Sequence, residues 1–410
     1  MNSGADRGEE GLELKQKMAA VKEWFQAGTN MFFLDYYHPD ELSKQNPGAY
    51  FPRASDMFFQ SISFGLFLIL IRLTLDKYVF KPVGTSWGIK AKKVYKIADI
   101  PELEKAYNRS KTLPHETIKT LMKKTSLTER QIQIWIRKRY QRDAPSTMQR
   151  FCESSWNFVV LSVFGVYGVY ALWNKSWFNK AIHCWIGWPN QPVTTDMFWY
   201  YLIELGFYWS TMFMITVDHK RKDYKEMTLH HLITIALLLF SWSNNFLRIG
   251  TLVLVVHDAA DSLLAAAKMS KYCEKERLTE VLYYIFIVVW IATRLVIFPY
   301  VLLYTTDFEI FEVDEPMITL VRDGWSYRSF NVLLHILLVL HFMWTYIILK
   351  TTYLQIIHGE IKDIRSESEE GNSGGEKIED EINRNSDTNN GDIICNGNSL
   401  NGYSQNYQIK

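Results

Sequence analysis

The sequence is poor in the features that mark disulfide-rich, metal-binding and nucleic-acid-binding proteins. It has only 4 cysteines in 410 residues, and none of them has CxxC spacing, so neither a disulfide framework nor a zinc site of the finger type is indicated. The formal net charge of +1 favours no polyanionic partner. Residues 1–25 mix acidic and basic side chains and lack an apolar core, so we expect no cleaved signal peptide.

Long apolar runs are what the sequence has instead. A run of about 20 apolar residues is long enough to cross a bilayer as a helix. We therefore predict an all-α fold, a polytopic membrane helix bundle of about seven transmembrane helices. The predicted spans are 56–76, 153–173, 197–217, 228–242, 246–267, 281–304 and 330–353.

Basic residues in the connections predict the orientation. Lys and Arg are more frequent in 218–227 and 268–280 than in 174–196 and 305–328, and basic connections stay in the cytosol. The N-terminus is then lumenal and the C-terminus cytosolic. The predicted regions are a lumenal segment 1–55, a first transmembrane helix 56–76, a cytosolic insert 85–145, a transmembrane domain 150–356 and an acidic cytosolic tail 357–410.

The tail is rich in Ser, Asn, Gly, Glu and Asp, a composition that cannot bury a core, so we expect it to be disordered. Ser366 and Ser368 lie in SESEE, which is similar to the target sites of acidic-directed kinases. A purely solubilising tail is the alternative interpretation.

The insert contains TSLTERQIQIWIRKRYQR, which resembles the turn and third helix of a homeodomain. A homeodomain reads adenine with an Asn on that helix, and Lys138 stands in its place. The stretch upstream is short for a complete first helix. We therefore expect a structural or regulatory module, and Lys138 argues against DNA binding and against a membrane-tethered transcription regulator.

Ionisable residues gather in two consecutive predicted spans. Such residues inside a membrane are costly and mark functional sites. If the spans form a hairpin that turns at Asn244 and Asn245, then His231 and His257 are equally far from the turn, at a depth of about 20 Å from the lumenal side. The candidate catalytic residues are His230, His231, His257, Asp258 and Asp261.

Two other interpretations of these histidines are open. A single histidine within a span is commonly a packing residue, which is our interpretation of His335 and His341. His and Asp at helical spacing also suit a metal. The chain has none of the HxxxH or HxxHH boxes of membrane di-iron enzymes, and we predict no metal, although the spacing leaves a single zinc open.

The spaced motif H-H-x-x-T, S-[YW]-x-x-N-x-x-R-x-G and H-D-x-x-D-x-x-L resembles the ceramide synthases, a branch of the TLC-domain proteins. Many animal members also have a homeodomain-like insert. The resemblance implies a TLC-type domain at 150–356, an endoplasmic reticulum membrane location, and acyl transfer from a fatty acyl-CoA to the amine of a sphingoid base. It implies membrane lipid around the bundle and no cofactor, and it leaves a homo- or hetero-dimer open.

The residues suit this reaction, because a buried histidine whose pKa is near neutral pH can accept the amine proton, and an aspartate can orient the imidazole. Either a histidine activates the amine directly, or His230 is itself acylated, the route that the resemblance favours. Where the family has LLExAK, this chain has Ala265. The candidate substrate-binding residues are Thr234, Asn245, Arg248, Lys220, Arg221, Lys222 and Lys268. The alternative function is a non-catalytic TLC-domain lipid sensor or a translocon-associated protein.

Overall fold

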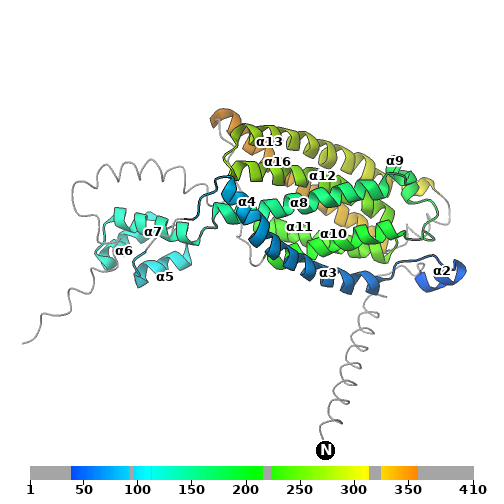
Figure 1. Cartoon of the computed structure of the whole chain (residues 1–410), viewed down its shortest axis with the longest axis horizontal. Helices are drawn as coiled ribbons and strands as arrows, with labels where there is room; N and C mark the ends of the chain where they lie inside the picture. The colour runs from blue at the N-terminus through cyan, green and yellow to red at the C-terminus, as the bar shows by residue number, and fades with distance from the viewer. Residues whose placement is uncertain (1–37, 93–96, 112, 216–222, 314–324, 359–410) are drawn as a thin grey trace, which may run out of the picture. The chain divides into compact units, whose positions relative to one another are not determined.

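The protein is all helical, which confirms the predicted fold class. The computed structural model describes residues 38–92, 97–111, 113–215, 223–313 and 325–358, and these ranges contain helices and connections but no strand. The chain divides into two units, a bundle of long helices and a small unit formed mainly by residues 89–150 (Figure 1).

The bundle is built from helices that coincide with the predicted spans. They are α3 (Ala54–Leu75), α8 (Thr147–Leu172), α10 (Thr195–Met214), α11 (Tyr224–Ser243), α12 (Leu247–Tyr272), α13 (Glu276–Trp290) with η3 (Ile291–Leu303) and α14 (Tyr304–Asp307), and α16 (Trp325–His358). Shorter elements are α2 (Pro39–Gln45), η1 (Asp76–Phe80), α4 (Lys81–Ser86), α9 (Ser176–Asn179), η2 (Ala181–Cys184) and η4 (Glu309–Glu312).

The chain is a multi-pass membrane protein, but a count of seven spans is not confirmed. Within the described residues, 5 helical stretches are long and apolar enough to cross a membrane. They are Ser55–Ser86, Glu129–Leu172, Leu247–Tyr272, Glu276–Asp307 and Trp325–Ile357. Helices α10 and α11 fall outside this set because Glu204, several Tyr and Trp residues, and the His230–His231 pair lower their apolar character.

The helices of the bundle pack closely against one another. Helix α10 packs mainly against α3 and α11, and α12 packs mainly against α13 and η3. The α3–α10 crossing is tight, since a Cβ on Gly65 would lie 2.8 Å from the carbonyl oxygen of Gly206. Segment η3 contains Pro299, which has no N–H to donate, and its wider π-helical turns accommodate that loss.

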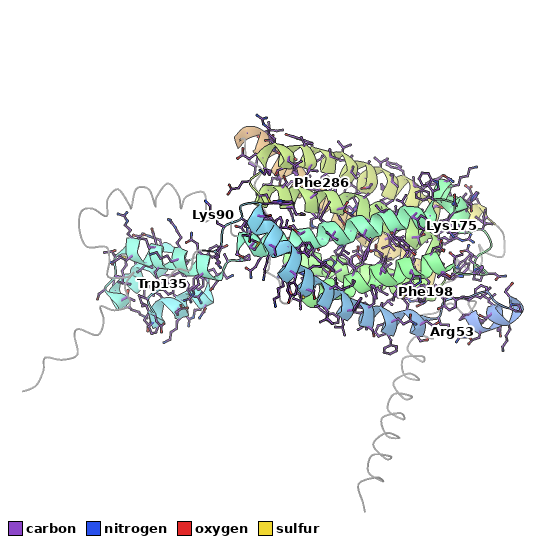
Figure 2. The ribbon with its side chains drawn as sticks, in the orientation of Figure 1. Arg53, Lys90, Trp135, Lys175, Phe198 and Phe286 are labelled. Atoms are coloured by element: carbon purple, nitrogen blue, oxygen red, sulfur yellow. The ribbon has the colours of Figure 1, made fainter. Side chains whose placement is uncertain are left out.

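The small unit is a three-helix module of α5 (Pro101–Arg109), α6 (His115–Thr125) and α7 (Glu129–Asp143). The stretch upstream of the turn therefore does form a first helix, although it has only 9 residues. Thr128 and Gln131 form a capping box that begins α7. Trp135 lies among the three short helices (Figure 2). The core is Leu103, Tyr107, Ile118, Leu121, Ile132 and Trp135.

Part of the basic character of α7 is used inside this module. The Arg139 side chain pairs with Glu104 at 2.9 Å and with Asp143, and it lies over the Tyr107 ring. Burial raises the pKa of Tyr107 to about 12, so its hydroxyl stays protonated. Arg139 thus stabilises the fold of the insert rather than presenting a free cation.

Candidate functional site

The hairpin that presents the predicted residues forms as expected. Helix α11 ends at Ser243 and α12 begins at Leu247. Asn245 adopts a left-handed backbone conformation with a φ of 58°, a conformation that Asn tolerates better than most residues. The histidine pair of α11 and the His-Asp cluster of α12 lie on opposite sides of this turn in the chain.

The histidines of α11 are buried beside aromatic rings. The ring centroids of His230 and His231 are 5.3 Å apart. The ring of Trp344 from α16 is perpendicular to that of His230, with centroids 5.2 Å apart, and the centroids of the Tyr208 ring from α10 and the His231 ring are 5.8 Å apart. Among the described residues, neither histidine has a hydrogen-bond partner for its Nδ1 atom. Two buried imidazole nitrogens are therefore left for another group to contact.

His257 is held by hydrogen bonds at both ring nitrogens. Its Nδ1 lies 2.6 Å from the carbonyl oxygen of Val253, one turn earlier on α12. Its Nε2 lies 3.1 Å from the Nε2 of His341 on α16. His341 is 1% exposed and its ring also packs on Phe298. A histidine that we predicted to be a packing residue therefore belongs to the site.

Asp258 is part of a buried acidic cluster. The hydroxyl of Tyr200 donates to its Oδ2 at 3.1 Å. The carboxyl group of Glu204, a residue that is 0% exposed, faces the carboxyl group of Asp258 within hydrogen-bond reach. Within the described part of the chain no N–H or O–H donor reaches the Glu204 oxygens. Two carboxyl groups in this position can hydrogen-bond only when one proton lies between them.

Asp261 is anchored by a buried guanidinium. Its carboxylate lies 3.2 Å from Nη2 of Arg294, which is 2% exposed and belongs to η3. Arg294 also donates to the carbonyl oxygens of Val256 and His257 at 2.7 and 2.9 Å. This side chain therefore ties η3 to the part of α12 that presents the His-Asp pair.

These groups form one site. His230 and Arg294 both lie within electrostatic range of His257 and of His341, and Asp261 lies within electrostatic range of Asp258. Four long helices and η3 thus bring the five predicted catalytic residues together, in agreement with the equal distances of His231 and His257 from the turn. Among the residues that the structure describes, no group of three His, Cys, Asp or Glu side chains is placed to hold a metal ion.

The other predicted residues lie elsewhere or use their polar groups internally. The Thr234 hydroxyl donates to the carbonyl oxygen of His230 at 2.9 Å. Asn245 donates to the carbonyl oxygens of Pro189 and Gln191, each at 2.8 Å. Arg248 donates to those of His183 and Ile186 and stacks on Trp177. Both are at the turn end of the hairpin, away from the histidines.

The cationic candidates are mostly outside the structure. Lys220, Arg221 and Lys222, together with Ser366 and Ser368, lie outside the described residues. Lys268 lies on α12, beyond Asp261 in the chain. Ala265, at the position of the departure from the motif, is buried on the same helix.

Four residues of the site were not among the predicted candidates: Tyr200, Glu204, Arg294 and His341. Two of them had a detectable signal, because Glu204 and Arg294 are charged residues in the middle of predicted spans. Tyr200 had none, since tyrosines are frequent in this chain. His341 lacked the neighbouring acidic or histidine residue that distinguished the other pairs.

The chain is similar to known proteins over most of its length. The TLC domain model matches residues 150–350, and the homeodomain model matches residues 90–143. The chain is 38% identical to ceramide synthase 5 of Mus musculus over 331 residues. This alignment covers 80% of this chain and 78% of the mouse protein. It is 36% identical over 350 residues to ceramide synthase 3 of Homo sapiens, with 85% and 88% covered. It is 38% identical over 341 residues to ceramide synthase 4 of Bos taurus, with 82% and 84% covered.

Proposed function

The chain belongs to the ceramide synthase family and is a sphingosine N-acyltransferase, and from this premise we propose that the buried histidines and acids of α11 and α12 carry out the acyl transfer. The substrates are a fatty acyl-CoA and a sphingoid base, and the product is ceramide or dihydroceramide. The catalytic residues in this proposal are His230, His231, His257, Asp258 and Asp261.

The observation that carries the proposal is the state of the α11 histidines. A buried polar atom without a hydrogen bond costs about 1–3 kcal/mol. His230 and His231 each keep such an atom, at Nδ1, within the described structure. Thr234, one turn away on the same helix, has its hydroxyl bonded internally. The open imidazole nitrogens are therefore the groups that a substrate can occupy.

We propose the covalent route, with His230 as the acyl acceptor. A nitrogen of His230 attacks the thioester carbonyl, a C–N bond forms, the C–S bond breaks, and CoA leaves as a thiolate that takes a proton. The amine of the sphingoid base then attacks the acyl-imidazole, and the chain passes to the amine with loss of one amine proton. Direct attack of the amine on the thioester is the alternative.

The acids have two separate roles in this scheme. Asp258, which accepts from Tyr200, lies next to the histidine cluster and stabilises positive charge that develops there. Asp261 is paired with Arg294, so it fixes the position of α12 relative to η3. Ala265 removes a carboxyl group that the family motif places one turn beyond Asp261, so this site works with one acid fewer.

We further propose an endoplasmic reticulum membrane location with a lumenal N-terminus and a cytosolic C-terminus. The connection 216–222 before α11 and the end of α12 then face the cytosol, where CoA is available. Lys220, Arg221, Lys222 and Lys268 are candidates to pair with the CoA phosphates.

Mass spectrometry of the purified enzyme tests the covalent route. Incubation with acyl-CoA alone should add the mass of one acyl group to the peptide that contains His230, and the sphingoid base should remove it. A His231→Gln variant is the matched control, because it should still be labelled at His230. Ceramide formation at the wild-type rate without any acylated peptide would support direct attack. Unchanged ceramide formation in a His230→Ala, Asp258→Ala double variant would contradict both routes.

A further inference from the structure

His341, on α16, contacts another imidazole of the site through a ring nitrogen: its Nε2 lies beside the Nε2 of His257. It lies outside the sequence motif of the hairpin. We propose that His341 is a further catalytic residue: its Nδ1 is the base that takes the proton of the sphingoid amine, and His257 orients it. This inference rests on the proposed function and assigns one of its proton transfers.

The hydrogen bonds determine where the protons of the neutral pair are. A carbonyl oxygen can only accept, so the contact at 2.6 Å with Val253 places the proton of His257 on Nδ1. The Nε2 of neutral His257 is then an acceptor. The 3.1 Å contact between the two Nε2 atoms therefore requires the proton of His341 on its Nε2.

This arrangement leaves one basic nitrogen in the pair. Both nitrogens of His257 are engaged, so His257 cannot take a further proton without losing a hydrogen bond. The Nδ1 of His341 is unprotonated, and no donor reaches it from the described residues. His341 is also within electrostatic reach of His230, the proposed acyl acceptor. The free base of the pair is thus His341 Nδ1.

The order of groups corresponds to that of a hydrolytic triad. There an acceptor fixes the tautomer of a histidine, whose other nitrogen then acts as the base. Here Val253 fixes His257, and His257 fixes His341. When His341 gains a proton, its Nε2–H bond to His257 becomes charge-assisted and stronger. This bond offsets part of the repulsion between the imidazolium and the guanidinium of Arg294, which lies within electrostatic range.

The proton balance is complete. The ammonium of the sphingoid base transfers one proton to His341 Nδ1 and becomes a free amine. The amine forms the C–N bond of the amide, the bond between the acyl carbon and its donor breaks, and the second amine proton goes to the leaving imidazole or thiolate. His341 then releases its proton to solvent, so no oxidant or additional reactant is needed.

Two substitutions at His341 separate a base from a merely orienting residue. His341→Gln can retain an N–H donor near the position of Nε2 but has no basic nitrogen. His341→Phe has neither. We expect both to lower kcat about 100-fold, the usual contribution of a general base, while kcat/KM for acyl-CoA stays within about threefold because the acylation step does not use this nitrogen. Matched controls are His335→Gln and His335→Phe, since His335 lies on the same helix, is 52% exposed and pairs with Asp307.

A near wild-type kcat for His341→Gln beside an inactive His341→Phe would overturn the proposal, because His341 would then only orient His257. Wild-type kcat in both variants would overturn it as well. The tautomers are read independently by ¹⁵N NMR of histidine-labelled protein in lipid. We expect His257 protonated at Nδ1 and His341 at Nε2, and the reverse would overturn the proposal even if no variant folds. A wild-type enzyme that makes no ceramide would instead refute the proposed function and leave the tautomer result standing.

Discussion

The two ends of the α11–α12 hairpin use polar residues in opposite ways. At the turn, Asn245 and Arg248 donate to backbone carbonyl oxygens of the 183–191 connection. At the other end, the Nδ1 atoms of His230 and His231 have no partner among the described residues. One polar atom of the turn, Asn244 Oδ1, also has no hydrogen-bond partner within the described ranges, although the amide nitrogen of Asn244 donates to the carbonyl oxygen of Phe240. Polar side chains at the turn therefore serve the fold, whereas two imidazole nitrogens at the other end are available for chemistry.

The strongest test of this comparison is His230→Ala. We expect kcat to fall at least about 1000-fold, because the substitution removes the proposed acyl acceptor. The melting temperature in detergent should fall only by the effect of the cavity that the lost ring leaves beside Trp344, since the lost Nδ1 makes no hydrogen bond to the described protein. A large loss of stability, with activity retained in the folded fraction, would show that His230 stabilises the fold and does not take part in the chemistry.

The acidic cluster offers a sharper test, with a control built into the pair. Asp258→Asn keeps the shape and removes the charge, and we expect kcat to fall about 100-fold. Glu204→Gln should cost less than about threefold, because Tyr200 already donates to Asp258, so the shared proton belongs on Glu204 and an amide can replace it. Equal losses in the two variants, measured by ceramide formation at saturating substrates, would contradict this assignment.

At the turn we expect the opposite result. Asn245→Ala removes two hydrogen bonds and places Ala in a left-handed conformation, for a loss of about 2–4 kcal/mol in unfolding free energy. Asn245→Gly relieves the conformation but not the hydrogen bonds, and should cost less. The kcat of the folded fraction should be near wild type in both. A drop in kcat without a lower melting temperature would mean that the turn takes part in catalysis.

The smallest expected effect is that of Thr234→Val. Its hydroxyl lies at the histidine end but is already bonded to the backbone of His230, so kcat should stay within about threefold. A loss of more than about tenfold, with an unchanged melting temperature, would show that the hydroxyl contacts substrate and that a bonded group at this end can also be functional.

Much of the arrangement was predictable from the sequence because it depends on local periodicity. The lengths of the apolar runs predicted the long helices. The equal spacing of His231 and His257 from Asn244 predicted that the two clusters of ionisable residues meet. The fine roles did not follow in the same way. Thr234 is one turn from His230 in any helix, yet a Thr hydroxyl there can equally bond its own backbone, as it does.

The residues that were missed come from helices distant in sequence. His341 reaches His257 across 84 positions, and Arg294 reaches the His257 carbonyl across 37. No period within one segment encodes such a contact; it depends on how whole helices pack. A charged residue in a span, such as Glu204 or Arg294, is a usable sign that a partner exists, but the partner itself is identified only by the fold.

The carboxyl pair of Glu204 and Asp258 has a consequence for how two very different substrates enter. With one proton between them, the pair carries one negative charge, and Asp261 and Arg294 cancel each other. With neutral imidazoles, the interior is therefore a weak anion. We expect it to attract the cationic head of a sphingoid base and to repel the phosphates of CoA. The nucleotide would then stay outside while the acyl chain and its thioester pass inward, so the two substrates would not need to share one binding surface.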